Sequence, residues 1–145
     1  MTHRASFNIV TPRNFLHEMI IPQHENFIED NSSSRHALLT ITLVYHMYEW
    51  VHETKFTESH FKSVYPPIEH RMVEKFDLAR NITNGTKHFK AKANTHVQLG
   101  FSSDFSEDFA RPLNIELPNG EQQSADSFLD EMVRFWERQE RRGIF

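Results

Sequence analysis

The sequence predicts a mainly α (α+β) fold, a helical bundle with a small two- or three-stranded antiparallel sheet before the C-terminal helix. Several long segments place apolar residues at helical spacing, and residues 34–55 are apolar on most sides. From about residue 96 the pattern changes to the alternation of strands. The 145 residues are the usual size of one domain, and 13 Phe and 2 Trp supply bulky side chains for its core.

The expected helices cover residues 12–30, 34–55, 67–90 and 125–141. The dipeptide Thr11-Pro12 is a favoured helix start, and Pro22 should kink the first helix or begin a second one. Either Ser33 or Ser34 can cap the second helix, because a serine oxygen can accept a free backbone N–H. Ser124 can cap the last helix in the same way.

The expected strands cover residues 96–101, 112–117 and 121–123. Residues 113–117 alternate between apolar and polar side chains, and the turn residues 118–120, Pro-Asn-Gly, follow them. A short helical piece is expected to begin near Thr57. We found no internal repeat or linker, so we interpret residues 1–145 as a single domain.

The segment ARNITNGTKHFK, residues 79–90, carries conflicting signals. Asn84-Gly85 is a strong turn dipeptide, and residues 81–86 give up roughly 3–4 kcal/mol of helix propensity relative to alanine. The apolar face of the preceding residues nevertheless continues without a slip, so we expect helix rather than turn. Its members in this segment are Ala79, Ile82, Thr86 and Phe89.

Composition excludes several classes of function. The net charge of −4 and the absence of a basic run argue against general nucleic-acid binding. There is no cysteine, and the four glycines do not form a phosphate-binding loop. No apolar run reaches the roughly 18 residues of a membrane span, and the N-terminus lacks a signal-peptide pattern. We therefore expect a cytoplasmic protein with no membrane association, in which its three N-glycosylation triplets are chance matches.

An unusual polar band lies on the helix expected over residues 67–90. At 100° per residue, Asp77, Asn81, Asn84 and His88 fall within this band. Short polar side chains of this kind are poor helix formers, so they suit a buried contact or a pocket better than an open surface. A second polar stripe on the helix over residues 34–55 is the expected partner. It comprises Thr42, His46, Glu49 and Glu53.

Arg80, Asn84 and His88 are spaced by four and share one helix flank. Histidine and arginine together suit cleavage of an RNA phosphodiester, because imidazole transfers protons near neutral pH and guanidinium holds phosphate. We take these three as candidate catalytic residues. The candidate binding residues are Asp77, Asn81, Lys87, His46 and Glu49. The alternative is that this polar band is a structural network that sets helix register.

Metal binding has weaker support in the sequence. Glu49 and His52 have the Glu-x-x-His spacing of helical di-iron sites, but no regular second motif accompanies them. The ten histidines are scattered along the chain. We therefore expect neither a metal ion nor another cofactor.

Three segments resemble a set of small uncharacterised bacterial and phage proteins: LVYHMYEWVHE, FDLARNITNGTKHFK and SFLDEMVRFWERQ. In that set a YH…W helix precedes an R-(D/N)-x-x-N-x-x-K-H helix, and an FW helix closes the domain. The resemblance covers about residues 37–139. More distantly, this pattern is similar to the HEPN superfamily of helical-bundle proteins.

The HEPN resemblance implies a homodimer that binds or cleaves RNA in a prokaryotic or phage conflict or defence setting. Many HEPN proteins are metal-independent endoribonucleases with an Arg…His motif at the dimer interface. That motif has four to six residues between Arg and His, whereas seven separate Arg80 from His88. Inactive relatives act as binding modules, so a non-catalytic module with a cognate protein partner stands as the alternative.

Overall fold

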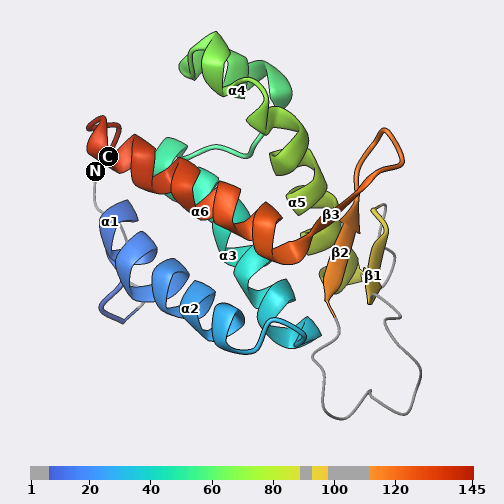
Figure 1. The fold of residues 1–145 in the computed structure, drawn as a ribbon. Helices are drawn as coiled ribbons and strands as arrows, with labels where there is room; N and C mark the ends of the chain where they lie inside the picture. The colour runs from blue at the N-terminus through green and yellow to red at the C-terminus, as the bar shows by residue number, and fades with distance from the viewer. Residues whose placement is uncertain (1–6, 89–92, 98–111) are drawn as a thin grey trace, which may run out of the picture.

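The computed structural model describes residues 7–88, 93–97 and 112–145. Within them the fold is mainly helical, with a three-stranded antiparallel sheet before the last helix, as the sequence predicted (Figure 1). The α-helices are α1 (Pro12–Phe15), α2 (Ile21–Glu29), α3 (Ser34–His52), α4 (Glu58–Val64), α5 (Met72–His88) and α6 (Ala125–Arg141). The strands are β1 (Thr95–Val97), β2 (Leu113–Glu116) and β3 (Gln122–Ser124).

The first expected helix forms as three consecutive pieces. A π-helical turn, η1 (Leu16–Ile20), joins α1 to α2, and the Ile21 N–H donates to the Leu16 carbonyl five residues back. Pro22 has no N–H to continue the ordinary α-helical hydrogen-bond pattern. The wider π-helical turn accommodates Pro22, and the helix continues as α2. Thr11 caps the start through a hydrogen bond from the Asn14 N–H to its side chain.

α3 lies at the centre of the bundle and begins where the sequence predicted. The Ser33 hydroxyl accepts the His36 N–H at 3.1 Å and caps the helix. α3 ends at His52, three residues before the expected end, because Glu53 adopts a left-handed conformation with a φ of 56°. A short connection leads from there to α4, which Thr57 caps.

α5 begins later than expected, at Met72. The preceding prolines produce a 3₁₀ turn, η2 (Pro67–Glu69), rather than the first turn of α5. α5 continues to His88, so the expectation of helix across Asn84-Gly85 is confirmed. The predicted inner face was wrong at Thr86, which is exposed, whereas Thr83 is buried. At 3.6 residues per turn, the inner face that contains Phe76 returns at Thr83, seven residues on.

The sheet has the order β1-β2-β3 with antiparallel pairing throughout. In β2, Leu113 and Ile115 are buried and the residues after each are half-buried, which is the alternation that the sequence predicted. The turn to β3 is closed by a 2.9 Å hydrogen bond from the Gly120 N–H to the Leu117 carbonyl. Expected strand residues 98–101 lie outside the described part of the chain.

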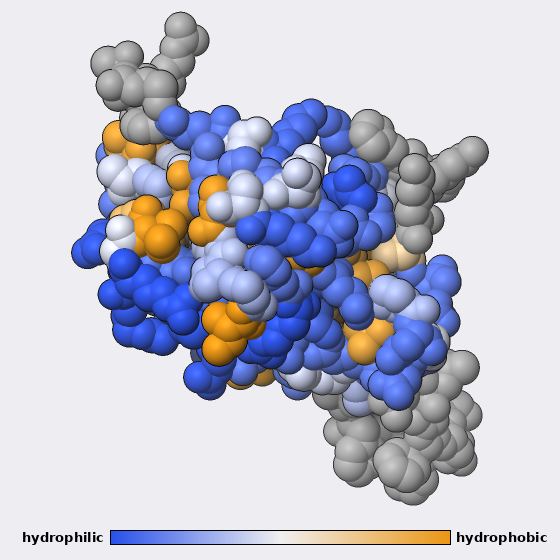
Figure 2. Space-filling view, turned by 90° about the horizontal axis from the view of Figure 1, so that it is seen from above, coloured by the Kyte–Doolittle hydropathy of each residue, from blue (hydrophilic) through white to orange (hydrophobic). Residues whose placement is uncertain are grey.

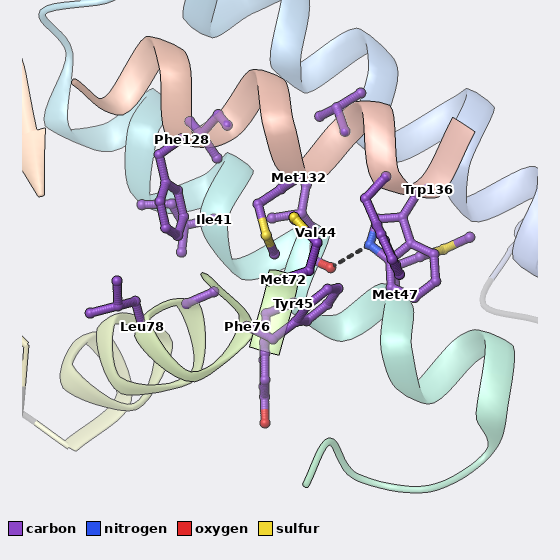
Figure 3. Close-up of a cluster of buried hydrophobic side chains, with 14 of the residues drawn as sticks. Ile41, Val44, Tyr45, Met47, Met72, Phe76, Leu78, Phe128, Met132 and Trp136 are labelled. Carbon is purple, nitrogen blue, oxygen red and sulfur yellow. Dashed lines mark hydrogen bonds between the residues drawn. The ribbon is translucent and has the colours of Figure 1, made fainter. Parts of the chain in front are cut away.

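The core lies where α3 meets α5 and α6 (Figures 1 and 3). Trp136 of α6 is fully buried, and its indole N–H donates to the Val44 carbonyl of α3 at 2.9 Å. Phe76 of α5 packs edge-on against the Trp136 ring, with 5.6 Å between ring centroids. Seen from the α4 end, the surface is mainly hydrophilic, with hydrophobic residues in small groups (Figure 2). The aromatic residues thus fill the core, whereas Asp77 and Arg80 of α5 are half-buried and Asn84 is exposed.

Candidate functional site

The predicted catalytic flank lies along α5. Asn84 and Lys87 are exposed, and Arg80 and Asn81 are half-buried. Arg80 and Asn84 stand one helical turn apart, as their spacing predicted. α5 ends at His88, whose side chain lies outside what the structure describes.

Arg80 forms an ion pair with Asp77 one turn earlier on α5. The Arg80 Nη2 donates to Asp77 Oδ1 at 2.5 Å, and the two side chains are 42% and 49% exposed. The Arg80 Nε is buried and has no hydrogen-bond partner among the described residues. Since a guanidinium carries five N–H donors, the ion pair leaves most of them available.

The charges of this ion pair act on Tyr45 of α3. Its ring is buried, and its hydroxyl points away from α6 (Figure 3). Burial raises the pKa of Tyr45, the positive charge of Arg80 lowers it, and the carboxylates of Glu49 and Asp77 raise it. These charges reach the phenol because α3 and α5 pack side by side. We call Tyr45, Glu49, Asp77 and Arg80 the α3–α5 polar surface.

His46 and Glu49, which the sequence analysis paired with the polar band of α5, are both exposed. The expectation that the two polar stripes bury each other was therefore wrong for these residues. The buried side of α3 runs through Ile41, Tyr45 and Tyr48, so Tyr45 lies inside and His46 turns outward. The ring centroids of Tyr45 and His46 are 5.8 Å apart. The result is an open polar surface rather than a closed network.

An open groove of about 520 Å³ lies between α4 and α5. Its lining includes Lys62 of α4, Arg71 just before α5, and Glu74 and Asp77 on α5. Asp77 therefore belongs both to this groove and to the ion pair with Arg80. The groove thus opens next to the α3–α5 polar surface, and its charges are of both signs.

A second polar group, which sequence reasoning missed, connects α3 to α4. The Tyr48 hydroxyl shares a hydrogen bond with His60 Nδ1 at 2.5 Å, and the Tyr65 hydroxyl shares one with His52 Nε2 at 2.6 Å. The two imidazole rings meet edge to face, with 5.3 Å between their centroids. We call these four residues the Tyr–His cluster. The four-residue spacing of Tyr48 and His52 was visible in the sequence, but their partners were not.

Burial controls the protonation of the Tyr–His cluster. Burial, aided by the nearby His60, lowers the pKa of His52 to about 4. Burial also raises the pKa of Tyr48 and Tyr65, so both phenols keep their protons. The protonated Tyr65 phenol and the neutral His52 imidazole therefore form a hydrogen bond between two uncharged side chains. This arrangement is stable near neutral pH and fixes α4 on α3.

A buried carboxylate holds η2 to the end of α6. Glu69 is 3% exposed, and its oxygens accept hydrogen bonds from Arg138 Nη2 at 2.8 Å and Gln139 Nε2 at 2.5 Å. Arg142 lies 3.4 Å from the same carboxylate. We call these four residues the Glu69 cluster. Among the described residues, every partner of the carboxylate lies in α6 or directly after it, which indicates a structural role for the cluster.

Within residues 7–88, 93–97 and 112–145, no group of three or more His, Cys, Asp or Glu side chains could hold a metal ion. Glu49 and His52 do not form part of such a group: Glu49 is exposed, and His52 bonds Tyr65. None of the helices in the same residues is long and apolar enough to cross a membrane.

The described residues define a mainly α class of protein with an open polar surface between its α3 and α5 helices. Comparisons with protein-family models, curated proteins and solved structures find no match for this chain.

Proposed function

We propose that this chain is a HEPN-like protein that binds RNA and cleaves it without a metal ion, in a prokaryotic or phage conflict or defence setting. In this proposal Arg80 holds a phosphate of the RNA backbone, Asn84 and Lys87 contact the adjoining nucleotide, and His88 transfers protons. A homodimer, which the resemblance to HEPN proteins implies, brings two such flanks together.

The accessibility of Arg80 carries this proposal. Its guanidinium is partly exposed and bonds only Asp77 among the described residues. Because both partners are accessible to water, their ion pair contributes little and a phosphate can compete with Asp77. The exposed Asn84 and Lys87 extend the same flank with a hydrogen-bonding group and a second positive charge. These features suit a nucleic-acid backbone better than a closed polar core.

Replacing Arg80 with alanine should weaken binding of single-stranded RNA about 10-fold or more, because one charge-assisted phosphate contact is lost. It should also abolish RNA cleavage. His88→Ala should abolish cleavage but retain most of the binding, because imidazole is the proton-transfer group. Fluorescence anisotropy measures binding, and a labelled RNA on a denaturing gel reports cleavage.

Arg134→Ala is the matched control for Arg80→Ala. Arg134 of α6 also pairs with an aspartate on its own helix, with Nε 2.7 Å from Asp130 Oδ2. Its loss should leave RNA binding and cleavage unchanged. Both arginine variants should melt close to the wild-type temperature, because each exposed ion pair contributes roughly 0–1 kcal/mol. Equal RNA affinity and cleavage in the two variants would contradict the proposal.

The acidic side chains beside Arg80 favour a second candidate function, a non-catalytic module that binds a protein. Asp77 occupies one side of the guanidinium, and Glu49 adds another negative charge near Tyr45. A mixed-charge surface of this kind can set the specificity of a protein interface. In this case the α3–α5 polar surface would bind a cognate protein rather than RNA.

Replacing Asp77 with asparagine distinguishes the two candidates. If RNA competes with Asp77 for Arg80, the substitution should tighten RNA binding about 3–10-fold, because it removes a negative charge and frees the guanidinium. The same anisotropy assay measures this change, and Asp130→Asn on α6 is its control. An RNA affinity that is the same in both variants and independent of Arg80 favours the protein-binding module.

A further inference from the structure

The groove between α4 and α5 combines an apolar floor with charges that have no partner. α4 lies at one end of the bundle, beside the start of α5 (Figure 1). The buried side chains of Phe56 and Val73 line this groove together with the exposed side chains of Arg71 and Glu74. No described residue forms an ion pair or hydrogen bond with the side chain of Arg71 or of Glu74. The volume of about 520 Å³ is typical of a site for a small organic group.

The other charged side chains that line the groove are paired already. On α4, Lys62 Nζ lies 3.7 Å from Glu58 Oε1. On α5, Asp77 accepts a hydrogen bond from Arg80, which lies outside the lining of the groove. A ligand that enters the groove therefore meets one guanidinium and one carboxylate whose hydrogen-bonding capacity is unused among the described residues.

We propose that this groove binds a guanine base of single-stranded RNA. The Glu74 carboxylate accepts the N1–H and N2–H groups of the base, and the Arg71 guanidinium donates to its O6 and N7. This inference rests on the proposed RNA-binding function and names the base that its site selects. Asp77 connects the two parts of the site, because it lines the groove and pairs with Arg80, the proposed phosphate ligand. The base and its phosphate therefore lie on opposite sides of Asp77.

Guanine is the base whose edges match this pair of charges. Its N1–H and N2–H donors point the same way, so they can bond to both oxygens of one carboxylate. Its O6 and N7 acceptors are the usual partners of an arginine guanidinium. Adenine, cytosine and uracil each place an acceptor beside the donor on the Watson–Crick edge, and a carboxylate repels that acceptor. The apolar floor suits the face of the uncharged base.

Labelled oligoadenylates that carry a central G, A, C or U test this inference. Fluorescence anisotropy should show that the wild type binds the G-containing RNA about 10-fold or more tightly than the other three, the effect of one bidentate base contact. Glu74→Gln should reduce this preference to about 2-fold or less, because the amide replaces one acceptor oxygen by a donor. The melting temperature should stay at the wild-type value, because Glu74 is exposed and has no partner among the described residues.

Glu25→Gln is the matched control, because Glu25 is an exposed carboxylate on α2 and does not line the groove. It removes the same charge as Glu74→Gln, so it should keep the wild-type preference for guanine. Equal affinity of the wild type for all four RNAs overturns the guanine inference and leaves the RNA proposal standing. A guanine preference that Glu74→Gln retains in full also overturns the inference. If the wild type binds none of the four RNAs, both proposals are overturned.

Discussion

Glu69→Ala should lower the free energy of unfolding by about 3 kcal/mol, one of the two largest effects that we expect in this protein. The substitution removes a carboxylate that is 3% exposed and leaves the Gln139 amide, itself only 1% exposed, without its acceptor. It also leaves Arg138 next to an empty pocket. Urea unfolding followed by tryptophan fluorescence measures the change, and the melting temperature should fall by about 10 °C.

Glu58→Ala is the control for this loss. Glu58 is also ion-paired, with Oε1 3.7 Å from Lys62 Nζ, but its side chain is 66% exposed. Its removal should cost no more than about 0.5 kcal/mol. Glu69→Gln should fall between the two, since an amide oxygen can still accept from Gln139. If Glu69→Ala costs no more than Glu58→Ala, the carboxylate does not hold η2 to α6.

The second large effect concerns acid. When the pH is lowered from 6.5 to 4, the free energy of unfolding should fall by about 2 kcal/mol because of His52 in the Tyr–His cluster. The pKa of His52 falls from 6.5 in the unfolded chain to about 4 in the folded protein, mainly through burial. In this window the unfolded chain binds the proton and the folded protein does not, so stability falls as pH falls. A full shift would correspond to about 3 kcal/mol, which the partial exposure of His52 reduces.

His52→Phe separates this effect from general acid sensitivity. Phenylalanine keeps a ring at the position but cannot bind a proton, so the loss of stability between pH 6.5 and pH 4 should shrink by about 2 kcal/mol. Some dependence should remain, because burial also lowers the pKa of His24. The control is His46→Gln, because His46 is an exposed histidine on the same helix. An unchanged pH profile in His52→Phe would rule out His52 as its source.

Much of the local structure could be predicted because its signals are local. Thr11, Ser33 and Ser124 each cap the helix that follows, through hydrogen bonds to backbone N–H groups three residues on. The alternation in residues 113–117 likewise predicted β2. At residues 81–86 the apolar pattern prevailed over poor helix propensity, since burial of Ile82 and Thr83 depends on the helix continuing.

The sequence-based predictions were wrong where the conformation of one residue ends a helix, or where a small rotation of a helix decides which side chain is buried. The left-handed Glu53 ends α3 early, although glutamate is not a usual residue for that conformation. On α3, His46 and Glu49 are exposed rather than buried against the polar band of α5, and on α5 Thr83 rather than Thr86 is buried. Periodicity predicted that these helices have a buried side but not which neighbouring residue marks its edge.

The sequence determined the helices, their caps, the alternating central strand and the flank that carries Arg80 and Asn84, because these depend on spacing within a few turns. Only the tertiary structure decided which polar side chains meet. Glu69 finds Arg138 across 69 residues of sequence, His52 finds Tyr65, and Tyr45 comes within reach of the charge of Arg80. Each pairing depends on how two helices pack in space, and the physical chemistry of each side chain follows from its burial there.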